Sequence, residues 1–143
     1  MKDTRCSFRQ VFLNITRSND QPMTRILIVD DSLFQRRIIS APLKIEGYEV
    51  LEAVNGSDGL EKIITLKPDL ILLDILMPEK DGFEVLKELQ SAHNTIPVIM
   101  LTSDVQDTTR DECLGLGAQA FVNKPVKGED LLPVIRSILG EKR

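Results

Sequence analysis

The chain has 143 residues, of which 42% are hydrophobic and 28% charged, and its net charge at pH 7 is -4. This length suits one domain, and the apolar content is sufficient for a single hydrophobic core. The scattered basic residues and the negative net charge argue against a nucleic-acid-binding surface. The longest apolar runs are too short to cross a bilayer, and the two cysteines, Cys6 and Cys113, form no disulfide framework or metal motif.

Residues 1–22 differ in composition from the rest of the chain and end in a turn-like segment. Four apolar residues in this region have helical spacing, which allows a short basic amphipathic helix that docks on the domain, a partner or a membrane surface: Phe8, Val11, Phe12 and Ile15. Met23 is an alternative translation start. We therefore expect residues 1–22 to be an N-terminal extension, disordered or a misassigned start, and residues 23–143 to be the functional domain.

From Arg25 onward, apolar runs typical of buried strands alternate with segments of helical spacing. We predict strands at 25–29, 48–53, 70–73, 97–101 and 120–122. We predict helices at 32–45, 58–66, 83–90, 108–116 and 130–139. Five such strand–helix units in this length imply an α/β fold, a parallel sheet with helices on both faces.

Prolines and glycines test the predicted helices. Pro42 lies inside the first helix, where it removes a backbone donor and is expected to kink the helix. If Asp130 is the N-cap of the last helix, Pro133 falls in its first turn, where no N–H is needed. Gly47 and Gly117 follow helical segments and suit left-handed C-terminal positions.

Acidic residues follow two of the predicted strands. Asp30 and Asp31 follow the first strand, and Asp74 ends the aliphatic third strand. If these strands are parallel neighbours, the three carboxylates gather at the edge of the sheet where open α/β proteins bind ligands. Two carboxylates about 4 Å apart repel by roughly 4 kcal/mol at an effective dielectric near 20, so the cluster needs a proton or a cation. A hard divalent ion is the simplest solution.

The fourth and fifth predicted strands end in polar residues at the same edge. Thr102 follows the fourth strand, and Lys124 with Pro125 follows the fifth. Acids for a cation, a hydroxyl and an ammonium group are the set required to place a phosphoryl group on a carboxylate, because that reaction depends on positioning and charge neutralisation. Aspartate is an established phosphoryl acceptor.

These motifs resemble those of response-regulator receiver domains, the phosphoacceptor modules of two-component signalling. The resemblance extends from Thr24 to the C-terminus and rests on four motifs: Asp30-Asp31, Asp74-x-x-Met77-Pro78-x-x-Asp81-Gly82, Thr102, and Lys124-Pro125. It implies a flavodoxin-like fold of three layers, in which five helices flank a five-stranded parallel sheet of order 2-1-3-4-5.

The resemblance also implies a metal site. Asp74 would be the phosphoacceptor. Asp31 would bind Mg²⁺ directly and Asp30 through water, while Asp74 and the backbone carbonyl of Leu76 would complete the protein's share of the ligands.

Phosphoryl-binding and switch residues are implied in the same way. Lys124 would pair with Asp74 before transfer and with the phosphoryl group afterwards, and Thr102 would donate its hydroxyl to that group. Phe121 would turn inward as Thr102 moves. The bond between Lys124 and Pro125 is expected to be cis.

Each site residue also has a simpler interpretation. Asp30 and Asp31 could cap a helix, Thr102 could be a turn residue, Lys124 a solvated charge and Phe121 a core or edge aromatic. Their conjunction at these spacings favours the receiver.

Three other functions fit parts of the pattern. An aspartyl-nucleophile phosphatase would need a second acid two residues beyond its nucleophile, where this chain has Leu76. A flavin carrier would want a phosphate-binding loop after the first strand, where Asp30 and Asp31 would repel phosphate. A pseudo-receiver usually lacks one of the site residues, and none is missing here.

We therefore expect a stand-alone, CheY-like receiver of chemotaxis or phosphorelay type. It would be a signalling module rather than an enzyme, although it would assist its own phosphorylation and dephosphorylation. The chain ends directly after the last predicted helix, so we expect no DNA-binding output domain. The expected partners are a sensor histidine kinase and a downstream target or phosphotransfer protein, with no nucleic acid and no membrane span. We expect a cytoplasmic monomer or weak dimer.

Overall fold

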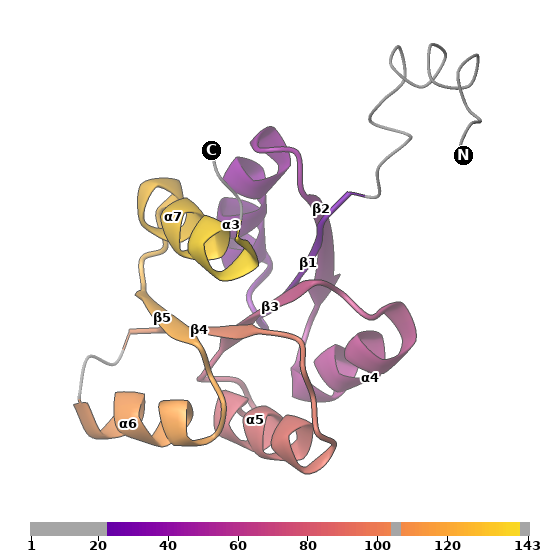
Figure 1. Ribbon diagram of the computed structural model, residues 1–143, viewed down its shortest axis with the longest axis vertical. Coiled ribbons are helices and arrows are strands. Elements are labelled where there is room, and N and C mark those ends of the chain that lie inside the picture. The colour runs from indigo at the N-terminus through magenta and orange to yellow at the C-terminus, as the bar shows by residue number, and fades with distance from the viewer. Residues whose placement is uncertain (1–22, 104–106, 141–143) are drawn as a thin grey trace.

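The computed structural model describes residues 23–103 and 107–140 (Figure 1). Its strands are β1 (Arg25–Val29), β2 (Glu49–Ala53), β3 (Leu70–Asp74), β4 (Val98–Thr102) and β5 (Ala120–Asn123). Its helices are α3 (Leu33–Ile45), α4 (Gly56–Leu66), α5 (Gly82–Ser91), α6 (Asp107–Gly115) and α7 (Gly128–Leu139). Every predicted strand and helix is present, with ends shifted by at most two residues. The amphipathic helix proposed for residues 1–22 lies outside the described residues.

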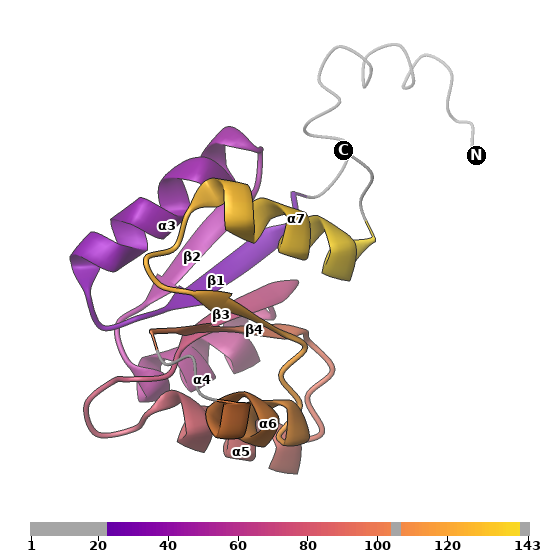
Figure 2. The ribbon, with the colours of Figure 1, turned by 90° about the vertical axis from the view of Figure 1, so that its left-hand side faces the viewer.

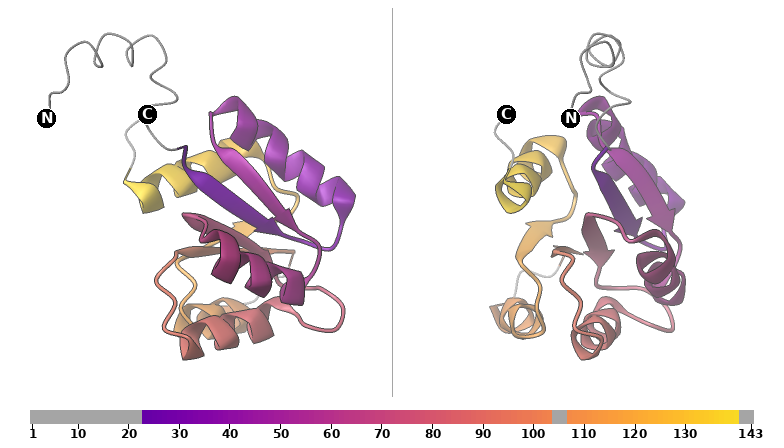
Figure 3. Two further views of the ribbon diagram at one scale, coloured as in Figure 1. Left: turned by 90° about the vertical axis from the view of Figure 1, so that its right-hand side faces the viewer. Right: turned by 45° about the vertical axis from the view of Figure 1, so that its right-hand side comes forward.

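The five strands form one parallel sheet in the order β2-β1-β3-β4-β5, as the resemblance implied. Helices α3 and α7 cover one face, and α4, α5 and α6 cover the other (Figures 1 and 2). Figure 3 shows the same two helical layers on opposite sides of the strands. The carboxyl ends of β1 and β3 are neighbours, because Val29 pairs with Leu73. This pairing places the acidic residues that follow the two strands side by side.

Alternation of side chains along the strands divides the core between the two faces of the sheet. In β1, Leu27 and Val29 join the cluster under α4, α5 and α6, whereas Ile26 and Ile28 join the cluster under α3 and α7. This follows from the two-residue period of a strand. All five residues of β3 are buried. Burial of each large aliphatic side chain stabilises the fold by about 1.5–3 kcal/mol, so the central strand is a rigid base for Asp74.

Local side-chain caps determine where three of the helices begin. The side chain of Ser32 accepts from the backbone N–H of Gln35, and that of Asn55 accepts from Asp58. Asp81 and Glu84 form a capping box at the start of α5. Such caps satisfy backbone donors that have no partner within the helix. The Asn55 cap explains why α4 begins before the predicted Asp58.

The prediction that Asp130 caps the last helix is wrong. Helix α7 begins at Gly128, and its N-cap, Lys127, makes no side-chain cap. The backbone N–H groups of Asp130 and Leu131 both donate to the Lys127 carbonyl, which adds a turn ahead of the predicted start. Pro133 therefore lies inside the helix. Because Pro133 has no N–H, the carbonyl of Glu129 lacks its hydrogen-bond donor within the helix. Glu129 is exposed, so water can supply that donor.

Helix α3 continues from Leu33 to Ile45 with Pro42 inside it. Gly47 and Gly117 have φ angles of 97° and 106°, so both adopt the predicted left-handed conformation. Within the described ranges, every helix is too short or too polar to cross a membrane.

Candidate functional site

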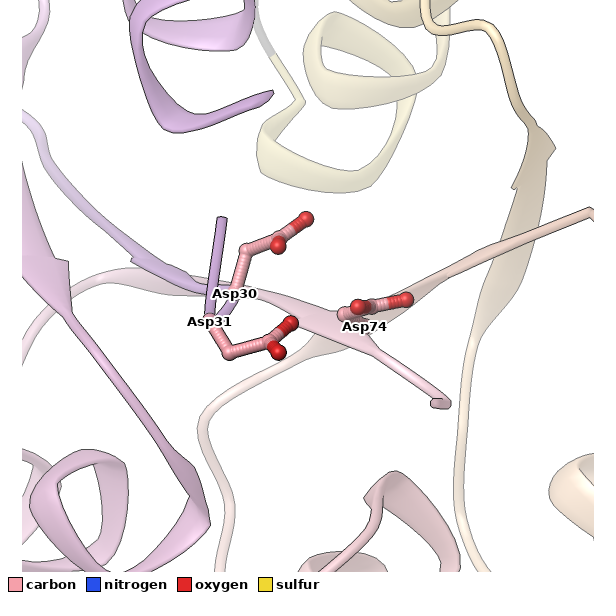
Figure 4. Close-up of side chains that lie close together, drawn as sticks. All are labelled: Asp30, Asp31 and Asp74. Atoms are coloured by element: carbon pink, nitrogen blue, oxygen red, sulfur yellow. The ribbon is translucent and has the colours of Figure 1, made fainter. Parts of the chain in front are cut away.

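Three carboxylates meet at the carboxyl edge of the sheet. Asp30 and Asp31 follow β1, and Asp74 is the last residue of β3. Each offers a carboxylate oxygen, and these oxygens lie within 4.8 Å of one another (Figure 4). The predicted acidic cluster is therefore present, and its oxygen donors are of the kind that hard divalent cations prefer.

The three carboxylates have different environments. Asp30 is completely buried, and its two oxygens accept from the backbone N–H of Ser32 at 2.9 Å and from the Lys124 ammonium at 3.2 Å. Asp74 is also buried. Asp31 is exposed, and its carboxylate makes no hydrogen bond or ion pair with any other residue in the described ranges. Asp31 is thus the carboxylate best placed to take a ligand from solution.

Lys124 bridges two of the acids. Its ammonium lies 3.0 Å from Asp74 Oδ1 and 3.2 Å from Asp30 Oδ2. The residue follows β5, where its backbone N–H donates to the carbonyl of Thr102 at 2.8 Å. The peptide bond between Lys124 and Pro125 is cis, as expected. The simpler interpretation of Lys124 as a solvated surface charge does not describe this geometry.

The environment changes the proton affinity of both members of the Asp74–Lys124 pair. Burial raises the pKa of the Asp74 carboxyl, the hydrogen bond from Lys124 lowers it, and the charge of Asp30 raises it, with a net upward shift. Burial lowers the pKa of Lys124, but its hydrogen bond to Asp74 and the charges of both acids outweigh this, so its net shift is also upward. The 3.0 Å contact is that of an ion pair, so Lys124 is a cation beside a poorly solvated carboxylate.

The loop after β3 folds tightly behind Asp74. The Leu76 backbone hydrogen-bonds the Asp74 carboxylate, and the Leu76 side chain is exposed. The N–H of Gly82 donates to the carbonyl of Ile75 at 2.8 Å. A Cβ at Gly82 would lie 2.6 Å from the Asp74 carbonyl oxygen, so only glycine fits without a shift of the backbone. The sequence identified Gly82 as part of a motif but did not reveal this contact.

Thr102 and Phe121 occupy the neighbouring strands. Thr102 is the buried last residue of β4, one position beyond Leu101, which pairs with Asp74. Phe121 in β5 is half-buried and packs against the core cluster of the α4, α5 and α6 face. The structure therefore places both proposed switch residues on strands beside the acidic edge, and Thr102 is a strand residue rather than a turn residue.

Arg36 is a functional residue that was not predicted from the sequence. This residue is buried on α3, donates to the carbonyl of Asp30 and forms an ion pair with Glu52. A signal was present, because Arg36 precedes the buried Ile39 and Leu43 by three and seven residues, which places a charged residue on the apolar stripe of the helix.

Comparison with known proteins agrees with this geometry. Residues 26–136 match the family model described as the response regulator receiver domain. Protein PilH of Pseudomonas aeruginosa is 40% identical over 119 residues, which are 82% of this chain and 98% of PilH. The transcriptional regulator RpaA of Synechocystis is 38% identical, and the match covers 82% of this chain but only 49% of RpaA.

Solved structures show the same likeness. Chemotaxis protein CheY4 of Vibrio cholerae superposes with a TM-score of 0.76 at 34% identity, over 82% of this chain and 99% of that one. A CheY-like receiver from Methanospirillum hungatei gives a TM-score of 0.78 at 34% identity, over 83% and 95% of the two chains. With an acidic cluster, a bridging lysine and this strand order, the chain belongs to the response regulator receiver domain family of two-component signalling.

Proposed function

We propose that this protein accepts a phosphoryl group on Asp74 from a phosphohistidine of a sensor histidine kinase. The observation that carries the proposal is the position of Asp74, which ends the buried central strand beside two further acids and 3.0 Å from the Lys124 ammonium. The receiver domain would comprise residues 23–143, and residues 1–22 would be an extension.

The residues at the acidic edge fit a magnesium ion. Three carboxylates supply the hard oxygen donors that Mg²⁺ requires. Asp31 would be the direct ligand, because Asp30 is already engaged by Ser32 and Lys124 and would act through water. Asp74 and the Leu76 carbonyl would complete the protein ligands. When bound, the ion would neutralise the clustered acids and the charge that develops on the phosphoryl oxygens.

The chain's own groups would carry out the transfer. An Asp74 carboxylate oxygen forms a bond to phosphorus as the bond from phosphorus to the histidine nitrogen breaks, and the electron pair of that bond stays with the imidazole. Lys124 then pairs with a phosphoryl oxygen in place of Asp74, and the Thr102 hydroxyl donates to another. Both contacts are charge-assisted hydrogen bonds, which are the stronger kind. The same groups would assist the later hydrolysis.

Phosphorylation would be relayed by partner binding. As the Thr102 hydroxyl moves toward the phosphoryl group, Phe121 would rotate inward and reshape the surface formed by α6, β5 and α7. The described residues form a receiver without a DNA-binding module. We therefore infer a cytoplasmic signalling module of chemotaxis or phosphorelay type, a monomer or weak dimer whose partners are a kinase and a downstream target or phosphotransfer protein. No nucleic-acid partner is proposed.

Site-directed phosphorylation tests the proposal. The full chain is incubated with acetyl phosphate and Mg²⁺, and the aspartyl phosphate is trapped by borohydride reduction and located by mass spectrometry. We expect modification at Asp74 that is absent without Mg²⁺ and absent in Asp74→Asn. Asp69→Asn, which changes the carboxylate directly before the same strand, is the matched control, and this variant should still be modified at Asp74. Modification at another residue, or in Asp74→Asn, would show that the assignment is wrong.

A further inference from the structure

Arg36 is a buried arginine on the face of α3 that packs against the sheet, with 7% of its surface exposed. A guanidinium is costly to bury unless its N–H groups are paired. Nη1 donates to the backbone carbonyl of Asp30 at 2.7 Å, and Nε donates to Glu52 Oε1 at 2.8 Å. One side chain thus connects the segment that follows β1 to Glu52 of β2.

The carbonyl held by Arg36 belongs to the peptide that links Asp30 to Asp31. On the other side of Asp30, its own N–H donates to the carbonyl of Ala53 at 3.2 Å. The Asp31 carboxylate has no protein partner among the described residues, so no hydrogen bond or ion pair orients it, and the backbone fixes where its side chain begins. Arg36 acts directly on that backbone.

The two hydrogen bonds from Arg36 to Asp30 and Glu52, together called the clamp, suit an arginine. Nε and Nη1 lie in one rigid plane, so the side chain can donate to two acceptors at a defined angle. A lysine ammonium is a single point donor and does not reproduce this fork. The Arg36–Glu52 pair is also net neutral, so the buried cation adds little repulsion toward a second cation at the acidic cluster. Its effect is therefore positional.

We propose that Arg36, supported by Glu52, is a positioning residue for the metal site. It clamps the Asp30–Asp31 peptide so that the Asp31 carboxylate points to where a divalent cation would bind. This inference rests on the proposed function, because it assumes that the acidic cluster holds such a cation.

Removal of the clamp should weaken metal binding more than it weakens the fold. Loss of a group that orients a metal ligand typically costs 10–100-fold in metal affinity. We expect Arg36→Gln to raise the dissociation constant for Mn²⁺ by about tenfold. Arg36→Lys should recover little of the lost affinity. Glu52→Gln should have a smaller effect in the same direction, because the amide oxygen can still accept from Nε.

Mn²⁺ titration of the full chain, followed by electron paramagnetic resonance, measures the affinity. Arg37→Gln is the matched control, since Arg37 is the exposed neighbour on the same helix and the change of charge is identical. The rate of phosphorylation by acetyl phosphate is then followed against Mg²⁺ concentration. A positioning role predicts that Arg36→Gln needs more Mg²⁺ to reach half its maximal rate, while the rate at saturating Mg²⁺ recovers. A general loss of structure would instead lower the rate at saturating Mg²⁺ as well.

Unchanged Mn²⁺ affinity in Arg36→Gln, or an equal loss in Arg37→Gln, would overturn the inference. If Arg36→Gln does not fold, Arg36→Lys decides the matter, because it keeps the charge without the fork of donors, and unchanged affinity in that variant would overturn the inference too. A wild-type chain that binds no Mn²⁺ would overturn the proposed function and the inference together. Binding by the wild type that Arg36→Gln retains in full would overturn the inference alone.

Discussion

The guanidinium of Arg110 in α6 lies over the ring of Phe121 in β5, with 5.3 Å between the guanidinium carbon and the ring centroid. A cation above an aromatic face is stabilised by about 0.5–1 kcal/mol at an exposed site. The contact joins α6 to β5, two of the elements whose surface the proposed switch would reshape. Arg110 therefore favours the half-buried position of Phe121 seen in this structure.

Arg110→Gln should shift the switch toward its inward state. The proposed rotation of Phe121 breaks the contact with Arg110, so its loss should raise the population of the inward ring by about two- to fivefold in the unphosphorylated protein. Fluorine NMR of fluorophenylalanine-labelled protein measures this population, with the Phe121 signal assigned by Phe121→Leu. Arg37→Gln is the control and should leave the signal unchanged. Identical spectra for wild type and Arg110→Gln would show that Arg110 does not hold Phe121 in its half-buried position.

Thr102→Ala should separate phosphorylation from its readout. The variant keeps Asp74 and Lys124, so a beryllofluoride mimic should still bind, but no hydroxyl is drawn toward it. We expect amide shifts near Asp74 to persist and those at residues 107–111 and around Phe121 to weaken. Heteronuclear NMR with and without the mimic makes the comparison. Full-sized remote shifts in Thr102→Ala would rule out this hydroxyl as the link.

Asp31→Asn should weaken cation binding more than Asp30→Asn does. Asp30 is buried and engaged by Lys124 and Ser32, whereas Asp31 is exposed with no described partner. A direct ligand contributes more than one that acts through water. Calorimetric titration with Mg²⁺ or Mn²⁺ provides the test, with Asp69→Asn as the control. A larger loss in Asp30→Asn would reverse the proposed ligand roles.

Gly82→Ala should damage the site through the backbone. The new Cβ would lie 2.6 Å from the Asp74 carbonyl oxygen and 2.8 Å from Ile75 Cα, so the end of β3 must shift. We expect a loss of about 1–3 kcal/mol in the free energy of unfolding, together with slower phosphorylation. Gly115→Ala is the matched control, because its Cβ meets nothing within 4 Å. That substitution lies in α6 and should be neutral or stabilising by up to about 1 kcal/mol. Urea denaturation measures both, and equal stabilities would contradict the close approach.

Cys113 should be an unreactive thiol near neutral pH. Burial, with a smaller contribution from the charge of Glu112, raises the pKa of Cys113 from 9.0 to about 11. The folded state therefore favours the neutral thiol, a contribution to stability that is complete below pH 9 and is lost as the pH rises through about 11. In a Cys6→Ser background, a thiol reagent at pH 8 should react slowly with the native protein and rapidly in urea. Fast labelling of the native protein would show that the thiol is accessible.

The sequence by itself determined the elements and the edge of the sheet at which the acidic residues lie. Uninterrupted aliphatic runs such as Leu70–Leu73 are typical of strands covered on both faces, and polar residues after them mark the carboxyl edge of the sheet. In a parallel sheet all such residues lie at one edge, so the pattern of the chain places Asp30, Asp31 and Asp74 at that edge, and they meet there if the first and third strands are neighbours. The strand order followed from family resemblance rather than from periodicity. Apolar strands have similar local patterns, so the pattern of one strand does not show which strand lies beside it.

Tertiary structure decided the features that depend on contacts distant in sequence. Helix α7 begins at Gly128 rather than at Asp130, and a Cβ at Gly128 would lie 2.9 Å from Pro42 Cβ on α3. The partners of Arg36 are assembled only when β1 and β2 pair and α3 covers them. The close approach of Gly82 to the backbone of Asp74 is likewise formed only in the folded chain. Periodicity shows which face of an element is buried, but packing alone determines which atoms meet there.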